Sequence, residues 1–388
     1  MLSFEGVLLP SLLASLLGTV LAINWLIDRA SGLGLLDEPG GRKHHARPTP
    51  LVGGLGMGVG LIAIWLLVPA MRPSTWILLG FAALLVLGAV DDRRELPALR
   101  KLVIELLVVG IALAGAGVTI RDLGMLLPGV EVSAGWLGWP LAVFGVVSVL
   151  NALNMIDGVD GLSGSVALVG FGALSVAAGL CGDASLMQAA LLPCSALAGF
   201  LAFNLRVPGR SAARVFMGDA GSLSIGYLLG VYAVVICQSA DVPAIVTVWA
   251  VALPLLDGLT VIQRRSARGI GVTQPGADHL HHLLKAWGFG VGQVSAIEAG
   301  LAVCLAGLGI LLWQLEIEDW VSLSMLLVLA LILRSASDRA WLLLERRNSN
   351  ARQQAMSTLG ADDADDPLAL GLTGDGGSTA GADFVDDS

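Results

Sequence analysis

Charged residues are scarce in this chain: Asp, Glu, Lys and Arg together make up 14% of its 388 residues, whereas 55% are hydrophobic. The mean hydropathy is +0.80. Soluble globular domains carry about 25% charged residues, so this composition excludes an ordinary soluble fold. The chain has instead a series of apolar stretches of roughly 18–23 residues, each long enough to cross a bilayer core as a helix.

These stretches predict an all-α, polytopic integral membrane protein with about eleven transmembrane helices. The first stretch has no basic segment before it and no A-x-A site after it, so we expect it to remain as a span rather than to be cleaved. We expect residues 1–345 to form one transmembrane domain. The stretches lie near residues 6–27, 50–70, 75–91, 101–118, 138–154, 162–181, 186–204, 219–237, 243–262, 291–313 and 319–341.

Cysteine is also scarce. The four cysteines, Cys181, Cys194, Cys237 and Cys304, lie in or beside apolar stretches and have no metal-ligand spacing. This arrangement argues against a zinc site with thiolate ligands and is typical of small buried side chains.

The C-terminal segment has no basic residues and no long apolar run. Residues 361–388 hold eight aspartates, which nearly account for the formal net charge of −9. Such a composition cannot bury a hydrophobic core. We therefore predict an acidic cytoplasmic tail at 346–388 that is disordered beyond about residue 350.

Basic residues are almost missing from one side of the predicted membrane protein. If the eleven spans alternate, one set of loops carries only Arg72 and Arg121, and the other set carries the remaining loop lysines and arginines. The positive-inside rule then places the N-terminus in the periplasm and the C-terminus in the cytoplasm. All five histidines fall on the cytoplasmic side, which indicates one site built from several loops.

The first cytoplasmic loop contains Lys43 and His44 among prolines and paired glycines. These residues restrict the loop and let it pack closely on the next helix, so the two basic side chains are suited to bind substrate phosphate. A basic anchor at the membrane surface explains the same residues, and their spacing leaves both interpretations open.

Two aspartates, Asp91 and Asp92, directly follow an apolar run, and Glu95 comes one turn later. On a helix Asp91 and Glu95 share a face, while Asp92 is turned about 100° away. Carboxylates at the C-terminus of a helix oppose its dipole. Asp91 and Asp92 are therefore candidate catalytic residues whose charge a cation or a substrate would compensate.

A third motif places polar groups every three residues where another span ends: Asn151, Asn154, Asp157 and Asp160. Polar side chains at membrane depth are rare and usually functional. Asp157 and Asp160 are therefore candidate catalytic residues, and Asn151 and Asn154 are candidate substrate-binding residues, although Asn151 by itself could simply link helices. Asp219 lies between glycines at the start of a later span, where a helix N-terminus can receive an anion and a bound cation together.

The last long loop brings basic residues together: Arg264, Arg265, His279, His281 and His282. No thiolate is near, and histidines beside arginines suit a diphosphate better than Zn²⁺. His279 is a candidate catalytic residue and the other four are candidate substrate-binding residues. Asp257 lies at membrane depth before this loop and is either a structural charge of the bundle or a site residue.

Together the motifs supply carboxylate and amide groups for a hard cation, basic groups for phosphates and glycine loops for close approach. Mg²⁺ is typically held by one or two carboxylates together with substrate phosphates, and Mn²⁺ accepts the same oxygen ligands. The residues therefore predict metal-dependent phosphoryl transfer at a membrane surface.

In order and spacing the motifs resemble those of the polyprenyl-phosphate N-acetylhexosamine-1-phosphate transferases, the family of WecA, TagO and MraY. The resemblance spans residues 10–345, and its H-x-H-H pattern and the stretch 204–210 are most similar to the WecA type. Its five motifs are R-K-H at Arg42, D-D-x-x-E at Asp91, N-x-x-N-x-x-D-G-x-D-G-L at Asn151, F-M-G-D-A-G-S at Phe216 and H-L-H-H at His279.

The resemblance implies an enzyme of the cell inner membrane whose active site faces the cytoplasm. It implies transfer of an N-acetylhexosamine 1-phosphate, with GlcNAc 1-phosphate as the first candidate, from a UDP-sugar to undecaprenyl phosphate. UMP is released and Mg²⁺ is required. The reaction would be the first membrane step of a cell-surface polysaccharide such as O-antigen, enterobacterial common antigen or teichoic acid.

The resemblance also implies roles for individual positions. Asp219 matches the metal-binding aspartate, and Asn154, Asp157 and Asp160 match the string associated with the nucleotide and the metal. Asp91 and its neighbour match a catalytic pair, and the three histidines match a cluster near the diphosphate. A homodimer is compatible with the resemblance, and no nucleic-acid partner is expected.

One segment departs from the family pattern. WecA-type members read S-P-F-x-P-D-R-x-H before the histidines, whereas this chain has Gly276 and Ala277 in place of the Asp-Arg pair. Without this guanidinium the segment lacks a bidentate partner for phosphate or sugar oxygens. The resemblance therefore does not determine which sugar the donor carries. MraY-like transfer of phospho-MurNAc-pentapeptide and an inactive homologue remain alternatives. A membrane transporter is a third, but transporter sites lie near the midplane.

The acceptor chemistry selects between two roles for Asp91. A phosphate monoester has a second pKa of about 6 and is largely dianionic at pH 7, so it hardly needs a general base. The larger barrier is repulsion between this dianion and the diphosphate of the donor. We therefore expect Asp91 to position groups or to contribute to the metal site rather than to accept a proton.

Overall fold

The computed structural model describes residues 4–38, 48–207, 209–210, 212–269 and 278–359. In these residues the secondary structure is almost entirely helical, which confirms the predicted all-α class. The helices are α1 (Phe4–Ile27), α2 (Ala30–Leu33), α3 (Gly53–Leu67), α4 (Thr75–Arg94), α5 (Ala98–Ala116), α6 (Gly138–Ile156), α7 (Leu162–Leu180), α8 (Ala184–Asn204), α9 (Gly218–Ser239), α10 (Ala244–Ala250), α11 (Ala252–Ala267), α12 (Leu280–Ala286), α13 (Val291–Gln314) and α14 (Asp319–Leu359). Two short strands, β1 (Leu36–Asp37) and β2 (Thr49–Pro50), and two 3₁₀ turns, Pro69–Met71 and Gly135–Leu137, complete the described elements.

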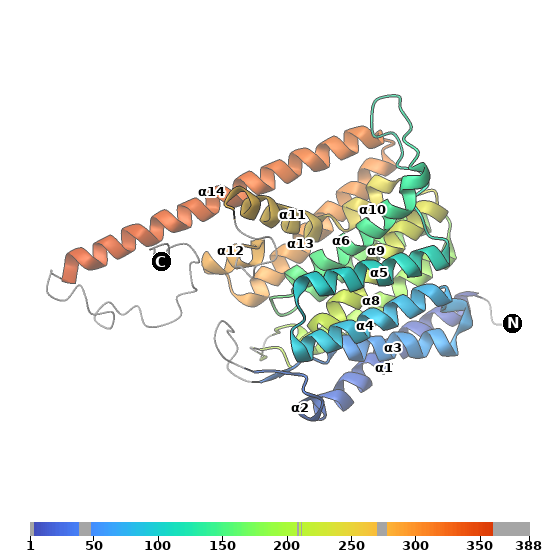
Figure 1. Cartoon of the computed structure of the whole chain (residues 1–388), viewed down its shortest axis with the longest axis horizontal. Coiled ribbons are helices and arrows are strands. Elements are labelled where there is room, and N and C mark those ends of the chain that lie inside the picture. Colours follow the sequence, from blue (N-terminus) through green and yellow to red (C-terminus); the bar gives the residue numbers. More distant parts are fainter. Residues whose placement is uncertain (1–3, 39–47, 208, 211, 270–277, 360–388) are drawn as a thin grey trace.

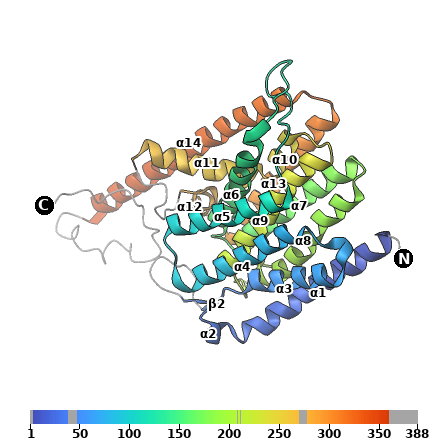
Figure 2. The ribbon, with the colours of Figure 1, turned by 45° about the vertical axis from the view of Figure 1, so that its right-hand side comes forward.

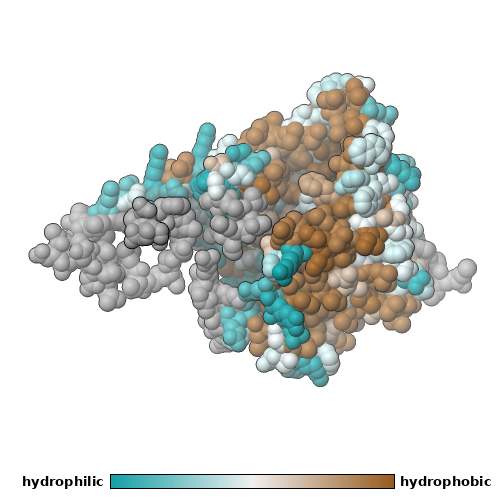
Figure 3. Space-filling model, viewed as in Figure 1, coloured by the Kyte–Doolittle hydropathy of each residue, from teal (hydrophilic) through white to brown (hydrophobic). Residues whose placement is uncertain are grey.

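The long helices form a bundle whose connections lie at its two ends (Figure 1). One end carries α2, β1, β2 and α12, and we call it the polar end. The apolar side chains on the face drawn in Figure 3 cover most of the bundle, whereas polar side chains are frequent at the polar end and on the projecting part of α14. Hydrophilic side chains also occur at the opposite end, so the distribution is that of a bundle whose apolar sides are surrounded by lipid.

Each of the eleven predicted spans coincides with a helix or with a helix pair. Among the described residues, eight helices are long and apolar enough to cross a membrane, or up to nine if α10 and α11 form one span. α3 is shorter, with 15 residues, and α5 carries Arg100, Lys101 and Glu105 in its first half. The polytopic membrane fold is confirmed, and the number eleven stays a prediction.

α9 lies at the centre of the bundle. Its apolar window is 89% buried, and it packs against α3, α4, α6 and α7. Glycine allows the closest approach: a Cβ added at Gly88 of α4 would lie 2.3 Å from backbone atoms of Asp219. Small residues let helices pack this closely in membranes. The end of α4 is thereby brought against the start of α9, where three candidate aspartates lie.

The predicted span at 243–262 is occupied by two helices, α10 and α11, bent by 78° relative to each other. Pro254 lies in the first turn of α11 and has no N–H to donate to the carbonyl of Ala250, so a continuous helix would lose a hydrogen bond there. The bend directs α11 toward the polar end, where it lies beside α14 in both views (Figures 1 and 2).

α14 is much longer than the predicted span at 319–341. It has 41 residues and projects from the bundle (Figure 1). The predicted tail boundary at 346 therefore falls inside a helix, and the expectation of disorder beyond about 350 is wrong as far as Leu359. Residues 340–359 are rich in Ala, Leu, Arg and Gln, whose high helix propensity continues the helix although few of its described side chains are buried. The rest of the predicted tail, 360–388, lies outside the described residues.

β1 and β2 form a short antiparallel ladder that pairs Leu36 with Pro50. The ladder continues into the segment before α9, because the N–H of Phe216 donates to the carbonyl of Pro50 and the N–H of Gly53 donates to the carbonyl of Phe216. The loop before α3 and the loop before α9 are thus joined by backbone hydrogen bonds, which fixes the approach to Asp219.

Candidate active site

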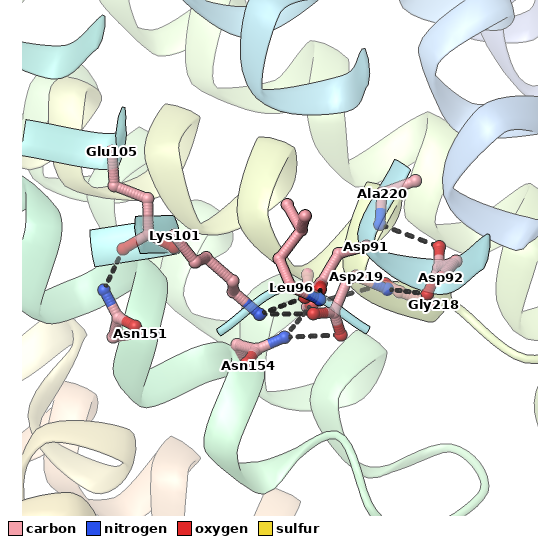
Figure 4. A network of polar contacts seen from close by, with 11 residues as sticks. Asp91, Asp92, Leu96, Lys101, Glu105, Asn151, Asn154, Gly218, Asp219 and Ala220 are labelled. Atoms are coloured by element: carbon pink, nitrogen blue, oxygen red, sulfur yellow. Dashed lines mark hydrogen bonds and ion pairs between the residues drawn. The ribbon is translucent and has the colours of Figure 1, made fainter. Parts of the chain in front are cut away.

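Lys101, in the first turn of α5, connects the ends of two other helices (Figure 4). Its Nζ donates to Asp91 Oδ2 of α4 at 2.8 Å and also to Asp219 Oδ2 at the start of α9. The ammonium lies between two carboxylates that would otherwise repel each other. Asp91 and Asp219, predicted from separate motifs, are therefore brought together by a residue that neither motif contains.

Asn154 completes this group from α6. Its side-chain amide donates to Asp219 Oδ1 at 2.9 Å and to Ser222 Oγ at 2.8 Å. We call Asp91, Lys101, Asn154 and Asp219 the acid–lysine cluster. It joins the ends of four helices at the polar end, and its groups are mostly buried.

Asp91 and Asp92 point to different partners, as their neighbouring positions on a helix require. Asp91 Oδ1 accepts from the N–H of Leu96 at 2.6 Å. Asp92 accepts from the N–H groups of Asp219 at 2.8 Å and Ala220 at 3.2 Å, so it caps the N-terminus of α9. The structure favours an anchoring role for Asp92 over the predicted catalytic one.

Glu95 does not share the face of Asp91. α4 ends at Arg94, and Glu95 has a φ of 47°, which turns the chain away from the helix. The prediction that these two carboxylates lie together was wrong because it assumed one more helical turn. Glu95 is exposed at the polar end.

Asn151 faces a buried carboxylate one turn deeper than Asn154. Its amide donates to Glu105 Oε2 at 2.6 Å and to the carbonyl of Val147 at 3.0 Å. Glu105 is fully buried, and its other oxygen has no partner within the described residues. The predicted substrate-binding role of Asn151 is therefore less favoured than a role in joining α5 to α6.

Asp157 and Asp160 lie in the turn after α6. Asp157 accepts from Ser163 Oγ. Burial raises the pKa of Asp157 to about 7, the Ser163 hydrogen bond opposes this rise, and the charges of Asp219 and Asp160 add to it. Asp160 Oδ2 accepts from Arg206 Nε at 2.7 Å and from the N–H of Ala213 at 3.2 Å. Asp160 therefore fastens the loop before α9, whereas Asp157 stays close to the acid–lysine cluster.

The three histidines lie together at the start of α12, beside Asp257 of α11. Asp257 Oδ2 is 2.7 Å from His279 Nδ1, and its Oδ1 accepts from the N–H of Leu280 at 2.9 Å. A carboxylate at this distance requires Nδ1 to donate, which leaves Nε2 available for a ligand. Asp257 is thus a site residue, one of the two interpretations left open by the sequence.

The histidine rings pack against one another. His279 and His281 are stacked with centroids 5.5 Å apart, and the centroids of His281 and His282 are 4.2 Å apart. Burial, followed by the charge of the neighbouring rings, lowers the pKa of His281 well below its ordinary value and that of His282 to about 4. His281 and His282 are therefore neutral near pH 7. We call Asp257 and the three histidines the histidine cluster.

The two clusters meet at Gly158, in the turn that carries Asp157 and Asp160. A Cβ added there would lie 3.1 Å from His281 Nε2. A Cβ at this distance would require the imidazole to move by a few tenths of an ångström, so a glycine favours the close approach of the histidines to this turn. The motifs of α6 and of the last loop are confirmed to share one end of the bundle.

Arg264 and Arg265 are both buried and contact protein groups. Arg264 donates to the carbonyl of Asp278 at 2.8 Å and to two residues of α14, and Arg265 Nε donates to Asp278 Oδ2 at 2.9 Å. This geometry favours a role in holding the segment before the histidines over the predicted contact with substrate. The two guanidinium groups fix backbone and carboxylate positions next to His279.

Two predicted residues and the altered loop are not tested. Lys43 and His44, and also Gly276 and Ala277, lie outside the described residues. Their predicted contacts with phosphate and with the donor sugar stay predictions.

Sequence reasoning missed Lys101 as a functional residue. It was counted only among the basic residues that set orientation, although it lies in an apolar helix together with Glu105. Ionisable residues at membrane depth are a recognised signal of function. The ten positions between Asp91 and Lys101 did not predict their ion pair, because the chain reverses direction between α4 and α5.

The donor atoms of the acid–lysine cluster fit a hard divalent cation. Asp219 and Asp91 offer carboxylate oxygens, and a 180° turn of the Asn154 amide, whose nitrogen faces Asp219, would present its oxygen beside them. Within the described residues no group of three or more His, Cys, Asp or Glu side chains is arranged to hold a metal. A Mg²⁺ ion bound by one or two carboxylates, substrate phosphates and water needs no such group, and the Lys101 ammonium lies where a positive charge is favoured.

Comparisons with known proteins show which proteins this chain is similar to. The family described as "Glycosyl transferase family 4" matches residues 74–237. A Yersinia pestis protein named undecaprenyl-phosphate alpha-N-acetylglucosaminyl 1-phosphate transferase is 32% identical over 80% of this chain and 86% of its own length. Proteins of the same name from Escherichia coli (strain K12) and Haemophilus influenzae are 30% and 28% identical, each over 85% of this chain and over 91% and 94% of their own lengths.

Proposed function

The chain belongs to glycosyl transferase family 4, and we propose that it transfers N-acetylglucosamine 1-phosphate from UDP-N-acetylglucosamine to undecaprenyl phosphate. The names of its relatives supply the sugar phosphate and the lipid acceptor. A nucleoside diphosphate sugar is the donor this transfer requires, because its phosphoanhydride bond breaks and releases UMP as the phosphoanhydride bond of the lipid diphosphate forms.

The observation that carries the proposal is the position of Lys101 between Asp91 and Asp219. A cation held at this point lies at the end of the membrane helices, where a lipid phosphate and a soluble nucleotide can meet. A secondary transporter would place such groups near the midplane of its spans. The cluster is also built from three of the motifs that define the resemblance.

The proposed reaction joins an oxygen of the acceptor phosphate to the sugar-bearing phosphorus of the donor and releases UMP. No proton has to be removed from the acceptor, which is largely dianionic at pH 7. The main barrier is therefore repulsion between anions, and Lys101 offers a positive charge against it. Asp91 holds Lys101 by an ion pair, so we assign it to positioning rather than to proton transfer.

Mg²⁺, when bound, would neutralise part of the negative charge on the diphosphate and orient it. Asp219 and Asn154 are the residues we propose to hold it, with Mn²⁺ as a substitute. His279 would donate from Nε2 to a phosphate oxygen after Asp257 has fixed its orientation. The other two histidines are neutral near pH 7 and would act as hydrogen-bonding groups rather than as cations.

We propose that the polar end faces the cytoplasm and that the protein lies in the inner membrane. The loops at this end carry most of the basic residues of the chain, as the positive-inside rule requires for a cytoplasmic face. This orientation would give the site access to UDP-sugars made in the cytoplasm. Cysteines introduced at 210 and 121, in a background without the four native ones, should react with impermeant reagents from opposite sides.

The activity is tested with the purified full chain, undecaprenyl phosphate and a panel of UDP-sugars, with UMP release as the readout. We expect UDP-N-acetylglucosamine to be used in the presence of Mg²⁺ and the activity to be lost with a chelator. Asp219→Asn should abolish release while the thermal midpoint in detergent stays near that of the wild type. If the enzyme turns over only a different UDP-sugar, that sugar replaces UDP-N-acetylglucosamine as the proposed donor. Full activity of Asp219→Asn would overturn the proposed metal site.

A further inference from the structure

The guanidinium of Arg264 connects the histidine cluster to α14. Its Nη1 donates to the carbonyl of Asp278, directly before His279, at 2.8 Å. Its Nε donates to Asp338 Oδ1 at 2.8 Å, and its Nη2 donates to Ser337 Oγ at 2.9 Å. One buried side chain thus binds the backbone next to a candidate catalytic histidine and two residues of a helix that carries no predicted site residue.

α14 has few other attachments to the bundle. Only 11% of its apolar window is buried, and it contacts α10 and α12. A second polar contact lies beside the first, where Arg334 Nη1 donates to Gln263 Oε1 of α11 at 2.7 Å. Both views show α11 and α14 side by side at this place (Figures 1 and 2). The polar contacts therefore determine where this part of α14 lies against α11.

His279 is held from two directions. Asp257 binds its Nδ1 and the next backbone N–H, while Arg264 and Arg265 bind the carbonyl and the carboxylate of Asp278. A guanidinium is planar and directs its donors along fixed lines. Removing an acceptor on the α14 side takes away one of the bonds that fix the orientation of Arg264, so its bond to the Asp278 carbonyl is held less firmly.

We propose that Asp338 and Ser337 of α14 are positioning residues for His279. They hold Arg264 in the orientation in which it binds the Asp278 carbonyl, and they act on the reaction only through it. The expected effect on kcat rests on the proposed function, but the effect of α14 on the position of His279 can be measured without enzyme turnover. The inference assigns the base of the projecting helix to the active site and gives α14 a role besides crossing the membrane.

Asp338→Asn tests this proposal, with Glu345→Gln as the matched control. Both changes remove one acidic charge from an exposed or partly exposed position of α14, and Glu345 lies outside the contact with α11. We expect Asp338→Asn to lower kcat about fivefold, because the interaction energy of a partly exposed charge pair corresponds to a rate change of about this size. The donor KM should change little. Asp338→Glu should recover most of the loss, and Glu345→Gln should match the wild type.

A double-mutant cycle tests whether Asp338 acts through Arg264. In an Arg264→Gln background, Asp338→Asn should have no further effect on kcat, because the side chain through which it acts is gone. If the two losses multiply instead, Asp338 acts independently and the proposal is overturned. Should Asp338→Asn not fold, Ser337→Ala removes the neighbouring contact and must shift kcat in the same direction by a smaller factor.

Labelling of the histidines with diethyl pyrocarbonate provides a readout that does not depend on activity. Fragment-ion mass spectrometry separates modification of His279 from that of His281 and His282 in the same peptide. The rate at His279 should rise severalfold in Asp338→Asn and stay unchanged in Glu345→Gln. Equal rates in the two variants, together with equal kcat, would overturn the proposal. If the wild type proves inactive with every UDP-sugar, the proposed function fails, but the labelling rates still decide whether α14 holds the histidine.

Discussion

The acid–lysine cluster and the histidine cluster lie at the same end of the bundle but are held in place differently. The acid–lysine cluster lies on the ends of α4, α5, α6 and α9, and α9 is the most buried of the candidate spans. The histidine cluster lies on α12, a helix of seven residues, and depends on side chains of α11 for its position. Packing of long helices therefore fixes one half of the site, and polar contacts fix the other half.

The clusters also differ in charge. The first combines carboxylates with one ammonium, whereas two of the three histidines in the second are neutral near pH 7. A cation is drawn to the first kind of surface and can in turn bind anionic substrates, whereas hydrogen bonds to phosphate oxygens suit the second. If this division is correct, loss of charge in the first cluster should do more damage than loss of a donor in the second.

The largest effect is expected for Lys101→Met. The methionine has a similar length but no charge, so the two carboxylates that Lys101 separates lose their shared partner. Removing one preorganised electrostatic group lowers kcat by about 10²–10³ in other enzymes, and we expect a loss of at least this size in UMP release. Arg100→Met, at the exposed neighbouring position, is the matched control and should stay near the wild type. A near-normal kcat in Lys101→Met would show that the acid–lysine cluster has no role in the reaction.

A smaller effect is expected for His279→Asn. The asparagine amide can still donate to Asp257, but the second ring nitrogen is lost. Loss of a hydrogen bond to a charged group lowers a rate constant by about 10- to 150-fold. We therefore expect kcat to decrease by a factor in this range, which is a smaller decrease than in Lys101→Met. The same assay measures both variants, with thermal midpoints as a check on folding. If His279→Asn lowers kcat more than Lys101→Met does, the histidine cluster contributes more to the rate than the acid–lysine cluster.

Asp157 lies between the clusters and should make stability depend on pH. Its pKa is raised to about 7 in the fold, above the ordinary value of an aspartate, so the folded chain binds more protons than the unfolded chain between these values. Stability should therefore fall as the pH rises toward 7, by about 2 kcal/mol between pH 5.5 and 7.5 for this one group. Thermal midpoints in detergent with a chelator present measure the trend. The slope should be smaller in Asp157→Asn, and an identical slope in both would contradict the shifted pKa.

The smallest effect is expected from removal of the acidic tail. A chain that ends after Leu359 keeps α14 complete, including its contacts with α11. We expect its kcat for UMP release to stay within about twofold of the full chain, since the acidic composition of residues 361–388 cannot bury a hydrophobic core. A cut at 334 instead removes Ser337 and Asp338 and should reduce activity through the histidine cluster. A large loss from the first cut would mean that the tail contributes to one of the clusters.

The membrane class and the main polar motifs could be predicted from the sequence because both are local features. A run of apolar residues gives a helix long enough for a bilayer wherever it occurs. The proximity of Asn154 to Asp219 was implied only by the resemblance, and the structure confirms it at 2.9 Å. The long continuation of α14 was missed because helix propensity beyond the membrane was given too little weight.

The pairing of charges could not be predicted in this way. Arg264 and Arg265 were expected to meet substrate because they lie in a basic loop, yet they bind Asp278 and residues of α14. Asp92 was expected to act with Asp91, yet it caps α9. Asp278 is only 13 and 14 positions away from these arginines, whereas the partners on α14 and at the start of α9 are 73 or more positions away.

Local sequence decided that this chain is a helical membrane protein with its polar residues at span ends, since hydropathy and helix length depend on neighbouring residues alone. Tertiary structure decided which polar groups meet. Lys101 joins Asp91 to Asp219 only because Gly88 lets α4 and α9 approach closely while α5 returns beside them. The reason is physical: electrostatic interaction depends on distance in space, and a folded chain brings together residues that are 118 positions apart.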